Sequence, residues 1–294
     1  NEAGENLTWD AKFVVDASGR DTFLSRRFGI KEKNPQHNSA AIFGHFSDVQ
    51  RRDGEDEGNI SIYWFDHGWF WMIPLREGVM SVGAVCFPDY LKTRSNSPQE
   101  FLWDTIKQCP GVYERMSNST LISEAQATGN YSYTSKKSFG NGYMLVGDAF
   151  AFVDPVFSSG VYLAMSSAEM GAEVVDECLR KPEKAAALMR KHEKRVRKGI
   201  KIFSWFIYRF TSPVMHHLFM NPRNHFRIEE AIISMLAGDI FRKTPIAKPM
   251  SLFKIIYYVA FTVQFAKARA LYKRRMKNAR LLFTDGTTAQ DNVD

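Results

Sequence analysis

The sequence is poor in cysteine. Its 294 residues include three cysteines, Cys86, Cys109 and Cys178, which lie far apart and form no C-x-x-C pair. An odd number of isolated cysteines excludes a disulfide framework and a zinc knuckle. We therefore expect a reducing, cytoplasmic compartment.

Several informative patterns are also absent. The seven histidines show no H-E-x-x-H or Cys/His spacing, so we expect no metal site. No Gly-x-Gly-x-x-Gly occurs, and the nearest pair, Gly140 and Gly142, precedes a strand rather than a helix. Neither a methionine nor a signal peptide opens the sequence at Asn1. We expect the chain to be the C-terminal portion of a longer protein.

The overall composition is that of a folded globular protein. Hydrophobic residues make up 45% and charged residues 24% of the chain, which argues against disorder and against a polytopic membrane protein. The length corresponds to one large domain or two small ones.

Positive charge is concentrated in the last third. Residues 181–280 hold 23 of the 39 Lys and Arg but only five of the 32 Asp and Glu. The solvated faces of amphipathic helices explain such an excess, and so does a partner with negative charge. The apolar stretch 252–266 is shorter than the ~20 residues of a membrane span, which leaves an interfacial helix as a lesser alternative. No nucleic-acid-binding signature accompanies the charge, so we expect no nucleic acid partner.

Hydrophobic patterning predicts an α/β protein with an antiparallel meander and a helical C-terminal region. The predicted strands are 12–16, 40–47, 60–65, 69–75, 79–87, 119–135 and 143–146. The predicted helices are 22–28, 98–108, 160–179, 182–210, 213–219, 227–241 and 251–283. The tail 284–294 is polar, and we expect it to be frayed.

The strongest local motif runs from Gly147 to Val161, with the sequence GDAFAFVDPVFSSGV. Asp148 follows a strand, where a carboxylate can accept hydrogen bonds from sugar or ribityl hydroxyls. Ser159 and Gly160 open a helix whose free N–H groups can bind a carbonyl, a phosphate or a halide. A plain helix cap is the alternative explanation.

Three motifs in order resemble a known family. Asp16-Ala-Ser-Gly-Arg20 with a following Ser-Arg, and the Gly-Asp-Ala to Asp-Pro segment at 147–155, resemble the flavoprotein hydroxylase superfamily with its p-hydroxybenzoate hydroxylase-like fold. Between them, Trp69-Phe-Trp71-Met-Ile73-Pro74 matches the W-x-W-x-I-P signature of the flavin-dependent halogenases. The sequences of Asp154–Val161 and Leu236–Phe241 are most similar to the branch that acts on phenols, pyrroles and carrier-bound substrates. The resemblance covers roughly residues 10–245.

The resemblance implies a domain organisation. Residues 1–36 would end a FAD-binding domain, 37–135 would form an antiparallel substrate-binding sheet with a helix, and 136–180 would return to the FAD domain. Residues 181–294 would form the basic helical C-terminal region.

The resemblance also implies roles for individual residues. The cofactor-binding set would be Asp16, Arg20, Gly147, Asp148, Pro155, Ser158, Ser159, Gly160 and Val161. Backbone N–H groups of Ser159 and Gly160 would hold the halide. The substrate side, with the passage from flavin to substrate, would contain Trp69, Trp71, Ile73 and Pro74. The family's catalytic lysine would precede this chain, so no lysine here is assigned to it.

The implied activity is that of a FADH2-dependent halogenase. Reduced FAD, O2 and chloride or bromide would give hypohalous acid, which halogenates a phenol or pyrrole that is free or bound to an acyl-carrier protein. The basic charge of residues 181–280 would dock this acidic carrier. A separate flavin reductase would supply FADH2. Two alternatives stay open: a FAD-dependent monooxygenase or geranylgeranyl-reductase-like oxidoreductase, and a catalytically inactive membrane- or carrier-binding module.

Overall fold

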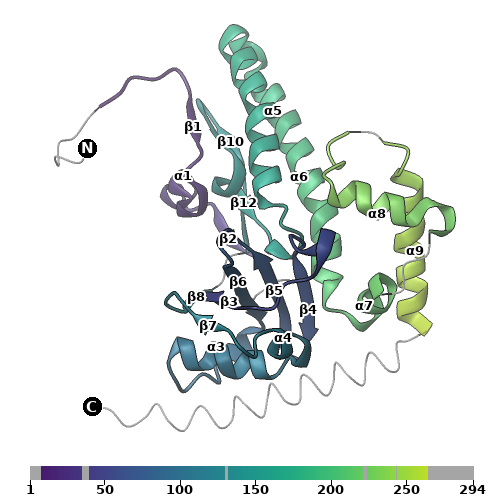
Figure 1. Ribbon diagram of the computed structural model, residues 1–294. Coiled ribbons are helices and arrows are strands. Elements are labelled where there is room, and N and C mark those ends of the chain that lie inside the picture. The colour runs from purple at the N-terminus through teal and green to yellow at the C-terminus, as the bar shows by residue number, and fades with distance from the viewer. Residues whose placement is uncertain (1–7, 35–39, 130–131, 221–223, 243, 264–294) are drawn as a thin grey trace, which may run out of the picture. The chain divides into compact units, whose positions relative to one another are not determined.

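The computed structural model describes residues 8–34, 40–129, 132–220, 224–242 and 244–263. The chain forms two compact units and enters each of them more than once (Figure 1). Unit 1 contains Asn1–Pro35, Ser132–Tyr208 and Arg223–Phe253, and unit 2 contains Gln36–Tyr131, Arg209–Pro222 and Lys254–Asp294. Strands and helices occur in both units, which confirms the α/β (α+β) class.

Unit 1 contains two small sheets. In the first, β1 (Val14–Asp16) runs parallel to β11 (Tyr143–Leu145), which pairs antiparallel with β10 (Phe139–Gly140). In the second, β9 (Tyr133–Ser135) pairs antiparallel with β2 (Lys31–Lys33) on one side and with β12 (Ala151–Phe152) on the other. Both sheets therefore join the start of the chain to the segment that contains the Gly147–Val161 motif.

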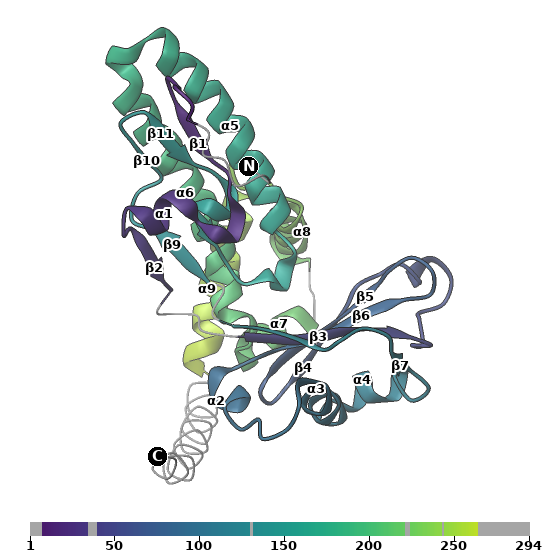
Figure 2. The ribbon, with the colours of Figure 1, turned by 90° about the vertical axis from the view of Figure 1, so that its left-hand side faces the viewer.

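Helices cover these sheets. The described helices that lie wholly or mainly in unit 1 are α1 (Phe23–Arg27), α5 (Gly160–Arg180), α6 (Ala185–Phe210) and α8 (Ile228–Leu236). Helices α5 and α6 lie side by side (Figures 1 and 2). Buried Val146 of the chain following β11 packs with Met189 of α6, and Leu145 packs with Val196 of the same helix. These apolar contacts pack α6 against the two residues that directly precede the Gly147–Val161 motif.

Unit 2 is built on one antiparallel sheet. Its order is β4 (Ser61–Phe65), β5 (Gly68–Pro74), β6 (Met80–Cys86), β3 (Ala40–Ser47) and β7 (Thr120–Leu121), and β8 (Gln126–Gly129) also pairs with β3. Short turns at Asp66-His67 and Glu77-Gly78 join the central strands, as their hairpin signals predict.

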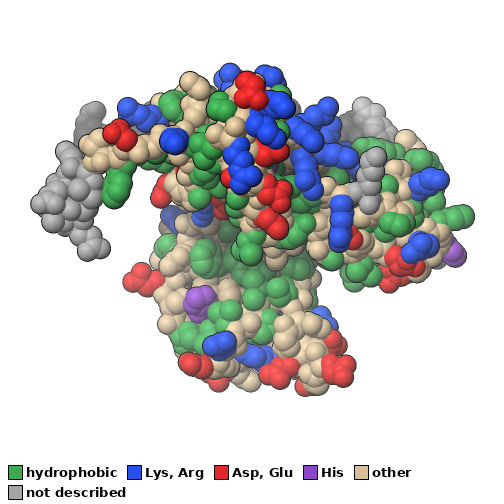
Figure 3. All heavy atoms as spheres, turned by 90° about the horizontal axis from the view of Figure 1, so that it is seen from above, with side chains coloured by type: hydrophobic (Ala, Val, Ile, Leu, Met, Phe, Trp, Pro, Cys, Tyr) green, Lys and Arg blue, Asp and Glu red, His purple; other side chains and the backbone are tan. Residues whose placement is uncertain are grey.

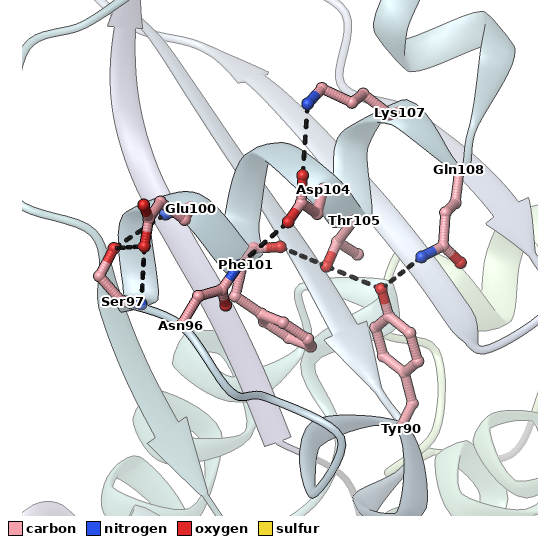
Figure 4. A network of polar contacts seen from close by, with 9 residues as sticks. All are labelled: Tyr90, Asn96, Ser97, Glu100, Phe101, Asp104, Thr105, Lys107 and Gln108. Atoms are coloured by element: carbon pink, nitrogen blue, oxygen red, sulfur yellow. Dashed lines mark hydrogen bonds and ion pairs between the residues drawn. The ribbon is translucent and has the colours of Figure 1, made fainter.

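One face of this sheet is covered by α2 (Pro88–Leu91), α3 (Pro98–Lys107) and α4 (Pro110–Arg115). Fully buried Phe70 and Met72 of β5 share a core with Leu102 and Ile106 of α3. A capping box begins α3: Ser97 and Glu100 exchange side-chain-to-backbone hydrogen bonds, as Figure 4 shows. The unit also holds α7 (Pro213–Met220), and the division between the units falls within α6 and within α9 (Ala247–Val263).

Most predicted elements are confirmed, but two are wrong. The stretch 119–135 is not one strand: β7 and β8 pair with β3 in unit 2, whereas β9 belongs to the second sheet of unit 1. The helix predicted to 241 ends at Leu236, because Gly238 has φ +100° and the Asp239 carboxylate accepts a hydrogen bond from the Ser234 hydroxyl. Residues 264–294, which include most of the predicted 251–283 helix and the polar tail, lie outside the described residues.

The described helices include none that is both long enough and apolar enough to span a lipid bilayer. The three cysteines are buried free thiols.

Candidate functional site

Asp16 organises the turn that follows β1. Its Oδ1 accepts the Ser18 N–H at 2.9 Å, and its Oδ2 accepts the Leu24 N–H at 2.7 Å. Because the first N–H groups of a helix lack partners within the helix, the second bond caps α1. The predicted cofactor residue Asp16 is thus buried and holds the 17–22 turn in place.

Arg20 lies exposed in that turn, beside the second predicted acid. The turn residues Gly19–Asp21 pack against the Gly147–Ala149 turn, which carries Asp148. Burial raises the pKa of the Asp148 carboxyl, and the Arg20 guanidinium opposes that rise. No hydrogen bond joins the Asp148 carboxylate to any of the residues that the structure describes. A half-buried acid of this kind is available to accept hydrogen bonds from a ligand's hydroxyl groups.

The backbone around Asp148 is fixed by two residues that the sequence analysis missed. The Tyr133 hydroxyl donates to the carbonyl oxygen of Asp148 at 2.9 Å, and burial raises the pKa of Tyr133 to about 12. The Ser167 hydroxyl of α5 accepts the N–H of Gly147 at 2.9 Å. Ser167 lies three residues after Ala164 and four before Gly171, so helical spacing places these small residues on one face of α5 and could have indicated Ser167. No comparable pattern marks Tyr133.

Lys31 places a cation beside Tyr133. Its Nζ lies 3.8 Å from the centroid of the Tyr133 ring and donates to the Thr22 hydroxyl at 3.0 Å. Burial lowers the pKa of Lys31, and the charges of Arg26 and Arg20 lower it further. The charges of Arg20 and Arg26 also act on the nearby Tyr133 hydroxyl, whose pKa they lower against the effect of burial.

The second half of the motif forms the entrance to α5. Asp154 is 1% exposed and accepts the Val156 N–H at 3.0 Å, which starts the short 3-10 turn Pro155–Phe157. Ser158 then adopts a left-handed conformation with φ +51°. Ser159 is 5% exposed, and its Oγ makes no hydrogen bond within the described part of the chain. A buried hydroxyl without a partner is costly unless a ligand supplies one.

Gly160 is the first residue of α5, and Val161 beside it is 72% exposed. The free N–H groups of this helix start are therefore flanked by an accessible apolar side chain. Such a surface suits a ligand with a flat apolar face and a polar edge.

The predicted substrate-side residues lie on one strand of unit 2. Trp69 and Trp71 of β5 point to the same face of the sheet, with ring centroids 6.0 Å apart. Trp69 is 4% exposed, and Phe210 packs edge-on against it at 6.3 Å. Ile73 continues this face, and Pro74 ends the strand; both are half-buried.

Trp71 lies across a glycine. A Cβ atom on Gly83 of β6 would collide with the indole ring of Trp71 and with Cβ of Phe43. The indole Nε1–H donates to the Ser81 hydroxyl at 3.2 Å, which sets the ring's orientation. The aromatic face is thus packed and oriented by its own sheet.

Neighbouring β4 extends this aromatic surface with Trp64, which pairs across the strands with Trp69. Its ring stacks on Phe210 at 4.7 Å, and its Nε1–H donates to the Phe210 carbonyl oxygen at 3.2 Å. His216 of α7 lies edge-on to the same ring at 4.6 Å. The sequence analysis did not single out Trp64, although the strand pattern placed it beside the W-x-W motif.

The structure thus gathers Asp16, Arg20, Gly147 and Asp148 at one place in unit 1, with the 155–161 segment continuing from the same motif. The Trp69–Pro74 residues form a separate face in unit 2. Among the described residues, no group of three or more His, Cys, Asp or Glu side chains is arranged to hold a metal ion.

Comparison with known proteins identifies the family. Residues 2–219 match the family model described as tryptophan halogenase. The chain belongs to the tryptophan halogenase family. Within this family, the 1H-pyrrole-2-carbonyl-[peptidyl-carrier protein] chlorinase of Pseudomonas fluorescens is 31% identical over 239 residues, which cover 79% of this chain and 52% of the chlorinase. The corresponding brominase of Pseudoalteromonas luteoviolacea is 32% identical, covering 58% of this chain and 43% of its own length.

The fold is also that of solved family structures. The flavin-dependent brominase Bmp2 superimposes with a TM-score of 0.75 at 25% identity, covering 87% of this chain and 64% of the brominase. This likeness confirms the predicted relation to flavin-dependent halogenases. The chain spans about half the length of the curated relatives it matches.

The residues present fit the flavin that the name of the brominase Bmp2 states. The Asp148 carboxylate and the Ser159 hydroxyl are both without hydrogen-bond partners among the described residues, and both belong to the Gly147–Val161 motif. A tricyclic ring with carbonyl and ribityl groups offers the complementary donors, acceptors and flat face.

Proposed function

We propose that the protein acts as a FADH2-dependent halogenase on an electron-rich aromatic substrate, in particular a pyrrole held as a thioester on a carrier protein. The observation that carries the proposal is the family match over residues 2–219. The carrier-bound pyrrole is supported by the relatives from Pseudomonas and Pseudoalteromonas, whose names state that substrate.

In this proposal, residues 1–36 and 136–180 are the FAD-binding parts. Asp148 accepts hydrogen bonds from ribityl or ribose hydroxyls, and Asp16 positions Arg20 on the diphosphate side. Pro155, Ser158 and Val161 line the ring system at the start of α5. When bound, reduced FAD supplies the reaction with O2 through which chloride or bromide becomes hypohalous acid.

The halide belongs at the entrance to α5. The N–H groups of Ser159 and Gly160 stand at the positive end of a 21-residue helix, where an anion is stabilised. The left-handed Ser158 turns the chain so that these groups open the helix. This chain's contribution is to hold the halide and to exclude water with Val156 and Phe152, which are buried or half-buried.

The substrate side is proposed to be the antiparallel sheet of unit 2, whose strands β3 to β8 lie within the predicted range 37–135. Trp69, Trp71, Ile73 and Pro74 present a dense surface without ionisable groups, which suits the guidance of a reactive acid towards an aromatic ring. The remaining region, 181–294, is basic and helical, and its contribution is taken up below.

The partners follow from the same reaction. A separate flavin reductase is proposed to supply FADH2, because the proposed reaction consumes reduced flavin. A cytoplasmic location is proposed because the three cysteines are buried free thiols rather than disulfides.

The test is a reconstituted reaction with the protein in its native length. FAD, a flavin reductase, NADH, bromide and chloride are supplied, with pyrrole-2-carbonyl loaded on a peptidyl-carrier protein or with free phenol as substrate. Products are identified by mass spectrometry. We expect a halogen isotope pattern, lost in Asp148→Ala and retained in Glu177→Ala, which changes an exposed acid of α5.

Other products would assign the protein differently. Hydroxylated product without halogen would favour the monooxygenase or reductase-like alternative. Consumption of NADH with release of hydrogen peroxide and an unchanged substrate would favour an inactive binding module. Equal activity of the two variants would contradict the role of Asp148.

A further inference from the structure

The outer face of α6 carries a stripe of six exposed cations. They are Arg190, Lys191, Lys194, Arg195, Lys198 and Lys201. At 100° per residue these positions fall within about 140° of the helix circumference, over about 16 Å of its length. The opposite face is buried and includes Met189, Val196 and Phe203. We call the six residues the α6 stripe.

The stripe lacks acidic neighbours on its own helix. The one acid of α6 is Glu193, which forms an ion pair with Arg197 at 2.6 Å and lies outside the stripe. Arg195 donates to the carbonyl oxygen of Phe241, but none of the six side chains forms an ion pair with a described residue. Residues spaced three or four apart on a helix are neighbours, so the like charges of the stripe repel one another.

The neighbouring helix has the opposite character. Helix α5 exposes four acids, Glu169, Glu173, Asp176 and Glu177, and its terminal cation Arg180 is paired with Asp176. Figure 3 shows Lys and Arg side chains gathered in a band over the α5–α6 end of the molecule. Solvation alone does not require cations and acids to lie on different helices. A mixture of both on α6 would avoid the repulsion between the like charges of the stripe. The separation therefore indicates an acidic partner for α6.

The inner face of the same helix contacts the proposed flavin site. Val196 packs with Leu145 and Phe150, which flank the Gly147–Ala149 turn that carries Asp148. The Arg197 guanidinium lies 4.7 Å from the centre of the Phe150 ring. A partner bound to the outer face would thus be one helix away from the reaction centre, a helix with side chains being about 10–12 Å thick.

From these observations we propose that the α6 stripe docks the acidic surface of the carrier protein that presents the thioester-bound substrate. The inference rests on the proposed function, because that function supplies the carrier. Complementary charge raises the rate of encounter and orients the two proteins. In this proposal the carrier protein binds this chain through one helix, α6.

The test compares two variants with the same change of net charge. The first, Lys191→Glu/Lys194→Glu/Lys198→Glu, reverses the centre of the stripe. The control, Lys12→Glu/Arg94→Glu/Lys248→Glu, reverses three scattered exposed cations. Circular dichroism checks the fold of both. Binding of a pyrrole-loaded peptidyl-carrier protein is measured by biolayer interferometry between 50 and 300 mM NaCl.

We expect the stripe variant to bind the carrier at least tenfold more weakly than the wild type at low salt, with a flatter salt dependence. The control should stay within twofold. Halogenation gives a second readout: kcat/KM with the carrier-bound pyrrole should fall more in the stripe variant than kcat/KM with a free phenol. Equal carrier affinity of the two variants would overturn the proposal.

Two further arms separate the possible failures. Stripe-dependent binding to anionic vesicles or to duplex DNA, or stripe-dependent self-association by sedimentation, without carrier binding, would assign the stripe to another partner and overturn the proposal. Halogenation of free phenol without carrier binding would reject the docking surface and leave the halogenase function standing. Carrier binding without any halogenation would reject the function and leave the docking surface.

Discussion

The phenolic hydroxyl of Tyr133 donates a hydrogen bond to the carbonyl oxygen of Asp148, 2.9 Å away. The bond joins β9 to the turn that holds the half-buried carboxylate, and it leaves the carboxylate itself unoccupied. Burial raises the pKa of Tyr133 to about 12, so the hydroxyl stays a proton donor throughout the neutral range.

Replacing this hydroxyl should loosen the turn. We expect Tyr133→Phe to weaken FAD binding about fivefold, which corresponds to the ~1 kcal/mol of one hydrogen bond. The loss should be constant between pH 6 and 9, since the wild-type phenol does not ionise there. Fluorescence titration with FAD measures it, with Tyr113→Phe, on the exposed side of α4, as the control. A pH-dependent loss would contradict this explanation.

At neutral pH, the Asp148 carboxylate should lower the stability of the flavin-free protein and strengthen its binding of FAD. Burial raises the pKa of its carboxyl, so ionisation at neutral pH is unfavourable in the folded protein. The stability that it contributes is fully present below the unfolded pKa of about 3.9 and is lost as the pH rises through the folded pKa. Asp148→Asn should therefore raise the free energy of unfolding of the flavin-free protein at pH 7, with the gain shrinking towards pH 4.5.

The same variant should bind FAD about tenfold more weakly, because a hydrogen bond to a charged acceptor is worth roughly 1.5 kcal/mol. Urea denaturation measures the stability and FAD titration measures the affinity. Glu177→Gln, which changes an exposed side chain of α5, is the control. A variant that loses both stability and affinity would show that Asp148 is a structural residue.

Local patterns predicted much of this fold. Strand β3 occupies its predicted residues 40–47, because alternating burial and flanking turns define it. The predicted start of α3 at Pro98 is also confirmed, because proline is favoured at the first position of a helix. The prediction of a single strand at 119–135 was wrong, because alternation indicates which side chains share a face but not which strand is the partner. Here the partner strands belong to two sheets.

The site was predictable in its residues but not in its contacts. The Asp16 motif and the Asp148 motif are separated by 131 positions, yet their turns pack together in unit 1. Nothing in the sequence indicated that Asp16 caps α1 or that the Ser159 hydroxyl is buried without a partner. Both facts depend on which backbone N–H groups the folded chain brings near each side chain.

His192 should make the protein sensitive to acid. Its ring is buried between α6 and α5, where Nε2–H donates to the Ser167 carbonyl oxygen at 3.2 Å and Nδ1 has no partner among the described residues. Burial lowers the pKa of His192. The neutral form is favoured, so its contribution to stability is present above the unfolded pKa of about 6.5 and is lost as the pH falls through the folded pKa.

We therefore expect the free energy of unfolding to decline from pH 7 to pH 5, and to decline less in His192→Gln, whose amide can still donate to Ser167. Thermal unfolding across this range measures the difference. His225→Gln changes an exposed histidine and should follow the wild type. Parallel curves for wild type and His192→Gln would refute the prediction.

Gly83 should be intolerant of a side chain. A methyl group there would meet the Trp71 ring and Phe43, so we expect Gly83→Ala to lower the free energy of unfolding by about 1–3 kcal/mol. Gly58→Ala, with open space around the added Cβ, is the matched control. Adding Trp71→Leu should recover part of the loss, which a double-mutant cycle by urea denaturation measures. Strict additivity would mean that the strain lies elsewhere.

The pairing of β2 with β9 has a consequence for synthesis. Lys31 is in register with Ser135, so the second sheet of unit 1 closes a loop of about one hundred residues. All the described strands of the unit 2 sheet lie within that loop, and its hairpins pair neighbours in sequence. On the ribosome the sheet of unit 2 can therefore fold first, whereas β1 and β2 have no partner strand until β11 and β9 have emerged.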